Sequence, residues 1–153
     1  MYRKSTQFSI IPENFEMPFS GKLSPGNRWI IMAELIPWAE FEVEYAEKFS
    51  EKIGAPAKPF RMALGALIIK EKLGISDRET VEQIKENPYL QYFIGLSEYS
   101  NEAPFEASMM VYFRERIKID CVKKINQKMV KDFQSETEEI KTEKKKKKQN
   151  WCK

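Results

Sequence analysis

The sequence predicts an all-α fold, a multi-helix domain with a helix-turn-helix-like corner, a long C-terminal helix and a disordered basic tail. Apolar residues recur at spacings of three and four, as on one face of a helix, and no segment alternates convincingly as a strand does. Glycines and prolines punctuate the chain at intervals of about one helix. The 153 residues, 42% of them hydrophobic, suffice for one domain with a core.

The chain divides into three parts by composition. Residues 1–27 are rich in proline and glycine and are expected to form an extended arm whose aromatic and aliphatic residues pack on the core. Residues 28–134 hold the helical patterns. Residues 135–153 are low-complexity and charged, so we expect them to be disordered or to form a fraying helix. The arm residues expected to pack are Phe8, Ile10, Phe15 and Phe19.

Two helices are expected before the centre of the chain. The first covers residues 28–36, with Asn27 as its N-cap and Pro37 as its stop. The second runs from Trp38 to about residue 53, before the glycine at position 54. Aromatic side chains repeat along it every four residues, and such a stripe is typical of a core-facing surface. The stripe is Phe41, Tyr45 and Phe49.

The third helix, residues 60–73, is apolar on most sides and should be the central, most buried one. Gly65 in its middle costs about 1 kcal/mol relative to alanine, so a close helix crossing is expected there.

The corner after this helix carries a stop signal and a start signal. Gly74 suits a left-handed C-cap because it has no Cβ. Ser76 with Glu79 forms the S-x-x-E pattern of a capping box, which starts a helix over residues 77–86 with Val81 and Ile84 inward. The break has the length of a helix-turn-helix corner, which occurs both in DNA-binding proteins and in plain bundles.

Two further helices follow. Asn87-Pro88 is a cap with proline at the first helical position, and the short helix behind it ends at Gly95. After a polar loop closed by Pro104, a long last helix is expected over residues 106–133. Its apolar residues recur strictly every four positions. Each such step moves the apolar side around the helix by about 40°, so the two ends of the helix cannot face the same partner.

The composition excludes several kinds of chemistry. Histidine is absent, so no Ser-His-Asp or Cys-His catalysis and no histidine metal ligand is expected. Cys121 falls at a core-like position and is interpreted as an inert thiol, and Cys121 and Cys152 show no metal spacing. No phosphate-cradling loop is present. We expect no metal, cofactor or small-molecule substrate, no membrane span, and a cytoplasmic location.

Charge distribution points to an anionic partner for the last helix. Bases dominate residues 114–131, whereas acids dominate the helix over 77–86, and acids repel phosphate. We expect Ser108 and Tyr112, near the start of the last helix, to lie nearest the bases of DNA. The competing interpretation is that these basic residues only form a solvent-exposed face of the helix and bind no partner. The expected phosphate contacts are Arg114, Arg116, Lys118, Lys123 and Lys124.

Two long runs carry a resemblance to a known family. "PFRMALGALIIKEKLGISDRETVEQIKENPYLQYFIGL" (59–96) and "PFEASMMVYFRERI" (104–117) closely resemble the N-terminal domain of bacterial insertion-sequence transposases of the DDE class. The resemblance covers roughly residues 8–134. One departure is Glu106-Ala107, where relatives tend to carry Asp-Pro, so the last helix should start less sharply.

The resemblance implies a helical module that binds the terminal repeats of the element. In the family, catalysis belongs to a following ribonuclease-H-like domain, where three carboxylates hold two divalent metals. This chain stops before such a domain, so we expect a truncated, nucleoid-associated protein with no catalytic residue of its own. Two alternatives stay open: a helical module that pairs with a second copy or with full-length transposase, and a non-functional remnant.

Overall fold

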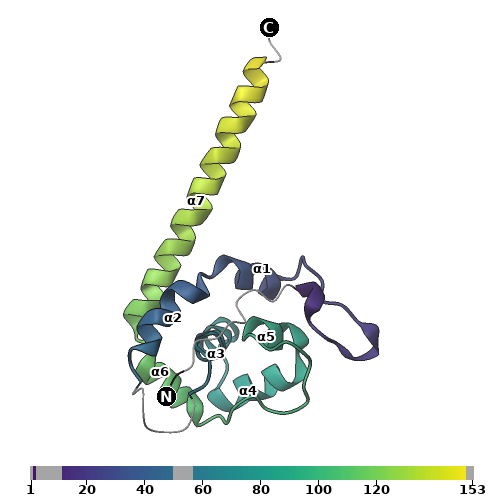
Figure 1. Cartoon of the computed structure of the whole chain (residues 1–153), viewed down its shortest axis with the longest axis vertical. Helices are drawn as coiled ribbons and strands as arrows, with labels where there is room; N and C mark the ends of the chain where they lie inside the picture. The colour runs from purple at the N-terminus through teal and green to yellow at the C-terminus, as the bar shows by residue number, and fades with distance from the viewer. Residues whose placement is uncertain (1, 3–11, 50–56, 151–153) are drawn as a thin grey trace. The chain divides into compact units, whose positions relative to one another are not determined.

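The computed structural model describes residues 2, 12–49 and 57–150, and it confirms an all-α architecture. The chain forms two compact units, Met1–Lys118 and Ile119–Lys153. Short 3-10 turns, Pro12–Asn14 and Pro18–Ser20, precede the α-helices. The α-helices are α1 (Arg28–Leu35), α2 (Trp38–Ala46), α3 (Phe60–Leu73), α4 (Asp77–Glu86), α5 (Pro88–Phe93), α6 (Met109–Arg116) and α7 (Ile119–Asn150) (Figure 1).

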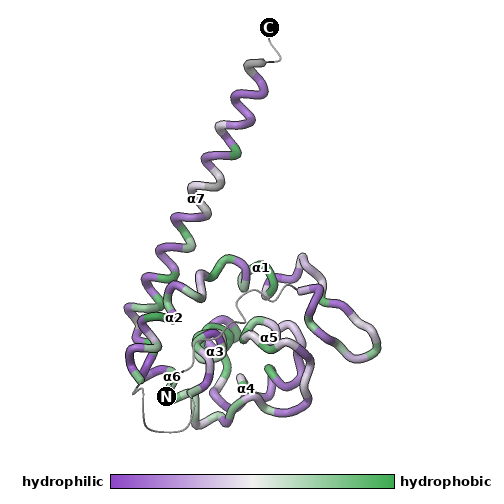
Figure 2. The backbone as a smooth tube through the Cα atoms, in the orientation of Figure 1, coloured by the Kyte–Doolittle hydropathy of each residue, from purple (hydrophilic) through white to green (hydrophobic). Residues whose placement is uncertain are grey.

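Helix α3 is the centre of the first unit, as predicted. It contacts α2, α4, α5 and α6, and Figure 2 shows hydrophobic residues along it. Phe60, Leu64 and Ile69 are fully buried. The close crossing expected at Gly65 is confirmed, because a Cβ on Gly65 would lie 3.0 Å from Cγ2 of Ile94 and 3.3 Å from its Cα.

The corner between α3 and α4 has the predicted glycine C-cap and serine N-cap, whereas the Glu79 half of the capping box is directed to Gln83 instead. Gly74 adopts the left-handed conformation, with φ 63° and ψ 38°. The Ser76 hydroxyl accepts from the Glu79 amide at 3.1 Å, and its carbonyl accepts from the Thr80 hydroxyl at 2.8 Å. The Glu79 carboxylate accepts from the Gln83 side chain. Val81 and Ile84 face the core as predicted.

The caps predicted at the other short helices are also confirmed. The side chain of Asn27 accepts from the Trp29 amide at 2.9 Å, and that of Asn87 accepts from the Tyr89 amide at 2.9 Å. Phe41 and Tyr45 are buried, as expected for a core stripe. Helix α2, however, ends at Ala46 rather than near residue 53, and residues 50–56 lie outside the described part.

The arm divides into a packed and an exposed part. Phe15 is buried against the ring of Tyr92, at 6.1 Å between centroids. Phe19 is instead fully exposed, so the expectation that it packs is wrong. Phe8 and Ile10 lie outside the described residues.

The last helix is not continuous, which corrects the prediction of one helix over residues 106–133. Helix α6 begins at Met109 and ends at Arg116, Ile117 is extended at φ −100° and ψ 91°, and α7 begins at Ile119. Phe113 and Ile117 are both buried. Residues four positions apart drift around a straight helix, so an uninterrupted helix would turn Ile117 away from the side that buries Phe113. Ending α6 at Arg116 allows both residues to be buried.

Of the two expectations for the tail, disorder and a fraying helix, the structure favours a helix, because α7 extends as far as Asn150. Lysine, glutamate and glutamine, which dominate this segment, are strong helix formers. Ser135 and Thr142 donate their hydroxyls to backbone carbonyls one turn earlier, which occupies the polar groups that would compete with the helix. Residues 151–153, including Cys152, lie outside the described part.

Two buried polar residues hold α5 in place. The guanidinium of Arg61 donates to the carbonyls of Tyr92 (2.9 Å) and Phe93 (3.0 Å), at the end of the helix where carbonyls lack partners. The Gln91 side chain donates to the carbonyls of Ile84 and Ser100 and accepts from the Ser100 amide. Together these contacts hold the loop after α5, which leads to α6.

Candidate nucleic-acid interface

One face of α6 is anchored in the core and the other is exposed. Met110 and Phe113 are fully buried, and Phe113 meets the ring of Phe105 edge-on at 5.2 Å. On the opposite side Val111 and Tyr112 are about half exposed, at 45% and 50%. The helix therefore presents a defined surface that contains residues predicted to contact DNA.

The start of α6 has no side-chain cap, which agrees with the less sharp start expected from Glu106-Ala107. Ser108 precedes the helix with helical angles, φ −60° and ψ −25°, and its side chain makes no cap hydrogen bond. A turn leads in, with the Met109 amide donating to the Glu106 carbonyl at 2.9 Å. The Ser108 hydroxyl is exposed and is not used for capping.

Arg116 and Tyr112 lie together. The Arg116 guanidinium is 4.5 Å from the ring centroid of Phe49 and 5.7 Å from that of Tyr112. The Lys48 ammonium donates to the Arg116 carbonyl. Burial raises the pKa of Tyr45, and the charge of Arg116 nearby offsets part of that rise. Aromatic contacts therefore hold this cation in place.

Arg114 points to the helix corner. Its guanidinium donates to both carboxylate oxygens of Asp77, at 2.7 and 2.9 Å, and Asp77 lies 3.6 Å from the Lys70 ammonium. The hydrogen bond from Arg114 lowers the pKa of Asp77, and Asp77 in turn raises that of Arg114. No local pattern indicates this pair, because its members are 37 positions apart.

The remaining predicted contacts fall on both units. Lys118 is exposed at the end of the first unit, and Lys123 and Lys124 are exposed on α7 in the second. The structure thus brings Tyr112 and Arg116 into contact, pairs Arg114 elsewhere, and leaves Ser108 and Lys118 exposed on the first unit. Cys121, on α7, is partly buried rather than fully buried.

The exposed face of α4 carries more acids than bases. Glu79, Glu82 and Glu86 are exposed, and Lys85 pairs with Glu82 at 3.8 Å. This excess of acids agrees with the prediction and disfavours α4 as a surface for phosphate.

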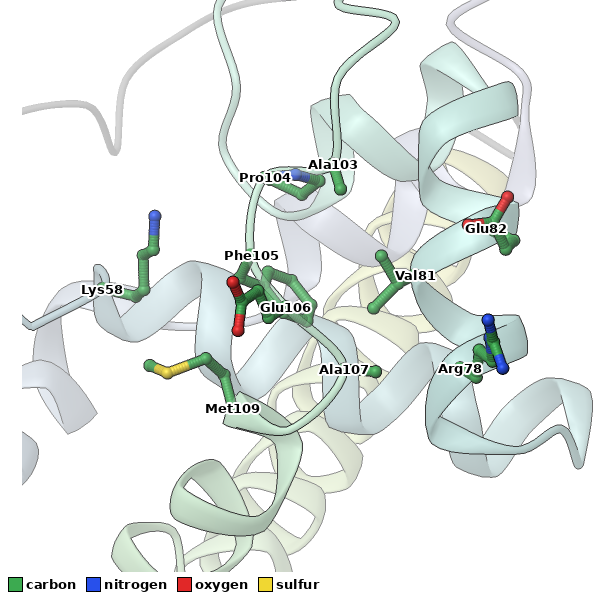
Figure 3. Close-up of a pocket in the computed structure, with 10 residues that line it drawn as sticks. All are labelled: Lys58, Arg78, Val81, Glu82, Ala103, Pro104, Phe105, Glu106, Ala107 and Met109. Carbon is green, nitrogen blue, oxygen red and sulfur yellow. The ribbon is translucent and has the colours of Figure 1, made fainter.

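An open depression of about 510 Å³ lies between α4 and the loop before α6 (Figure 3). Phe105, Val81 and Met109 supply its apolar part. Its charged lining is balanced in sign, so its chemistry selects no anion. The charged residues are Lys58, Arg78, Glu82 and Glu106.

Two kinds of feature are absent from the residues that the structure describes. There, no group of three or more cysteine, aspartate or glutamate residues is placed to hold a metal ion. No helix in the same ranges has the length and apolar character needed to cross a membrane.

Comparison with known proteins identifies relatives. The family described as Transposase domain (DUF772) matches residues 18–116. The curated protein "Uncharacterized protein ORF8 in nfe locus" of Rhizobium meliloti is 37% identical over 95 residues, which are 62% of this chain. The match covers 45% of that relative's length, so less than half of the relative is represented. No solved structure matches the chain.

Proposed function

Because the chain belongs to the Transposase domain (DUF772) family, we propose that it is the DNA-binding part of an insertion-sequence transposase of the DDE class. On this proposal it recognises the DNA at the ends of the element and acts at the bacterial nucleoid. The family match carries the proposal, since it covers α1 to α6 and thereby both the helix corner and the basic end of α6.

On the exposed face of α6, one group of residues would provide specificity for the DNA sequence and another would provide affinity. Tyr112 and Ser108 offer hydroxyls near the start of the helix, where groove-reading helices usually meet base edges. Arg116 and Lys118 follow at its end and would bind phosphates, which position a protein on DNA without reading sequence. Lys123 and Lys124, on α7 in the second unit, would bind phosphates in their own right.

Arg114 joins these contacts only if it leaves Asp77. The Arg114 guanidinium donates to both carboxylate oxygens of Asp77. A guanidinium binds two oxygens of a phosphate in the same bidentate way. The two partners therefore compete for Arg114. We place strand cleavage outside this chain and propose no catalytic residue within it.

A second candidate function is pairing with another helix. Val130 and Ile140 on α7 are exposed at 54% and 53%, and exposed aliphatic residues favour contact with a second copy or with full-length transposase. In that case DNA affinity would be incidental.

Fluorescence anisotropy with two labelled duplexes tests the proposal. One duplex carries the inverted repeat that flanks the gene, and the other carries the same bases shuffled. We expect both to bind, with affinity falling steeply as salt rises, and the repeat to bind more tightly. Absence of binding to either duplex at low salt would contradict the proposal, and a dimer in sedimentation velocity would then favour the second candidate.

A further inference from the structure

One indole ring in the first unit holds two cations. The Arg28 guanidinium lies 5.4 Å from the centroid of Trp29, and the Lys72 ammonium lies 6.0 Å from the same centroid. Arg28 is the first residue of α1, and Lys72 belongs to the last turn of α3. Both charges therefore lie within 6.0 Å of one ring centroid, although the two residues are distant in sequence.

The Trp29 ring is fixed by burial and by its neighbours. Trp29 is 3% exposed, meets Phe93 at 5.2 Å between centroids, and has its amide capped by Asn27. Arg28 and Lys72 are themselves exposed. Each charged end lies against the indole while its residue stays exposed to water. The two charges are therefore presented at the surface from fixed anchor points.

Neither cation has a carboxylate partner in the part of the chain that the structure describes. The ion pairs found there use Lys70, Lys85 and Arg114. Protein surfaces ordinarily intersperse the two signs, and neighbouring cations repel. The electron-rich face of the indole offsets some of that repulsion. Phosphates placed against the two charges would remove the rest.

We propose that Arg28 and Lys72 form a second phosphate-binding site for the backbone of DNA, separate from α6. The inference rests on the proposed function, because it extends the DNA contact to α1 and the end of α3. A guanidinium lying over a ring keeps its edge N–H groups free for phosphate oxygens, and an ammonium adds a point charge. Contacts to phosphates carry no sequence information, so the contribution of this site is independent of sequence.

The test measures the salt dependence of duplex binding in Arg28→Gln/Lys72→Gln. Each lost phosphate contact reduces the slope of log affinity against log salt by about 0.9, so we expect a slope smaller by roughly 1.8 and weaker binding to both duplexes. The matched control, Arg78→Gln/Lys85→Gln, removes two charges from α4 and should change the slope much less. Glutamine keeps part of each stem over Trp29, and circular dichroism melting verifies that both variants fold.

A charge-preserving variant separates charge from packing. Arg28→Lys/Lys72→Arg should keep the wild-type slope, whereas a slope as low as that of the glutamine variant would assign the effect to packing and overturn the site. Equal slopes for the glutamine variant and its α4 control would also overturn it. If the wild-type protein binds no duplex, the proposed function and this site both fail. If the wild type binds the duplexes and the glutamine variant keeps the wild-type slope, the proposed site fails while the proposed function stands.

Inorganic phosphate distinguishes a backbone site from a site for the free ion. At constant ionic strength, replacing chloride by phosphate should displace DNA from the wild type and from the glutamine variant to the same extent. Displacement by phosphate that depends on Arg28 and Lys72 would show that the site takes the free ion and would overturn the backbone assignment.

Discussion

Arg114 on α6 binds both carboxylate oxygens of Asp77, the first residue of α4, at 2.7 and 2.9 Å. The pair ties the helix proposed to contact DNA to the corner formed by α3 and α4. It also occupies the N–H groups with which Arg114 would bind a phosphate. The free protein therefore presents fewer cations on α6 than its sequence contains.

Releasing Arg114 should strengthen DNA binding. In Asp77→Asn the carboxylate is lost, so the guanidinium becomes available to a phosphate, and we expect the salt slope to steepen by about 0.9. Anisotropy titrations at several salt concentrations provide the measurement. Glu79→Gln is the control, because it removes the same charge within the first turn of α4 while the Arg114–Asp77 ion pair stays intact. Equal effects of the two substitutions would show that Asp77 acts only through its overall charge.

The same pair predicts how stability depends on pH. Arg114 lowers the pKa of Asp77 in the folded protein, so the ionised carboxylate stabilises the fold above its unfolded pKa of about 3.9. That stability is lost as the pH falls through the lower folded value. Urea unfolding should show wild type more stable than Asp77→Asn at pH 5–7, with the difference shrinking below about pH 4. A difference that persists unchanged at pH 2 would contradict a role for the charge.

Local signals made the corner predictable. The left-handed conformation of Gly74 depends on its own backbone alone, and Ser76 caps an amide three residues away. Both roles can therefore be identified from neighbouring residues. Gly65 was equally informative, because a glycine inside an apolar helix indicates that another element approaches closely. The central position of α3 followed from its apolar sides.

Long-range pairings were not predictable from one sequence. Arg61 is separated by about thirty positions from the carbonyls it binds, and nothing near it in the sequence marks a buried cation. Glu42 is likewise buried, where it accepts from the Tyr2 hydroxyl. The break at Ile117 was missed because no glycine or proline stands there, and tertiary burial of Ile117 overrides the helix propensity around it.

The packing at Gly65 gives a prediction with a matched control. Gly65→Ala gains about 1 kcal/mol of helix propensity but places a methyl group 3.0 Å from Ile94, and overpacking typically costs about 1–3 kcal/mol. We expect net destabilisation in chemical unfolding. Gly26→Ala should be nearly neutral, because nothing lies within 4 Å of its added Cβ. A Gly65→Ala protein more stable than wild type would show that α5 can move away from α3.

The caps of the corner should contribute to folding rather than to contact with DNA. Gly74→Val forces a β-branched residue to φ 63°, which should cost roughly 1–2 kcal/mol, and Ser76→Ala should cost about 1 kcal/mol. Melting temperature is the measurement, and the salt slope for DNA should not change in either variant. Unchanged melting in both would show that these caps add nothing to stability.

Substitutions on α6 should separate affinity for DNA from specificity for its sequence. Arg116→Gln/Lys118→Gln leaves the Arg114–Asp77 pair intact and should weaken binding to repeat and shuffled duplexes equally, with a slope smaller by roughly 1.8. Arg78→Gln/Lys85→Gln on the acid-rich α4 serves as the equal-charge control and should do much less. If the control loses binding and the α6 variant does not, α4 is the helix on the backbone.

Tyr112 should act in the opposite way. Tyr112→Ala is expected to reduce the preference for the repeat over the shuffled duplex while the salt slope stays the same, because base-edge contacts carry specificity and phosphate contacts only position. Since the ring lies 5.7 Å from the Arg116 guanidinium, its loss could also release that cation. Tyr112→Phe resolves the two effects, because it keeps the ring and removes only the hydroxyl. If Phe retains full discrimination and Ala does not, Tyr112 contributes through stacking on Arg116 rather than through a hydrogen bond to a base.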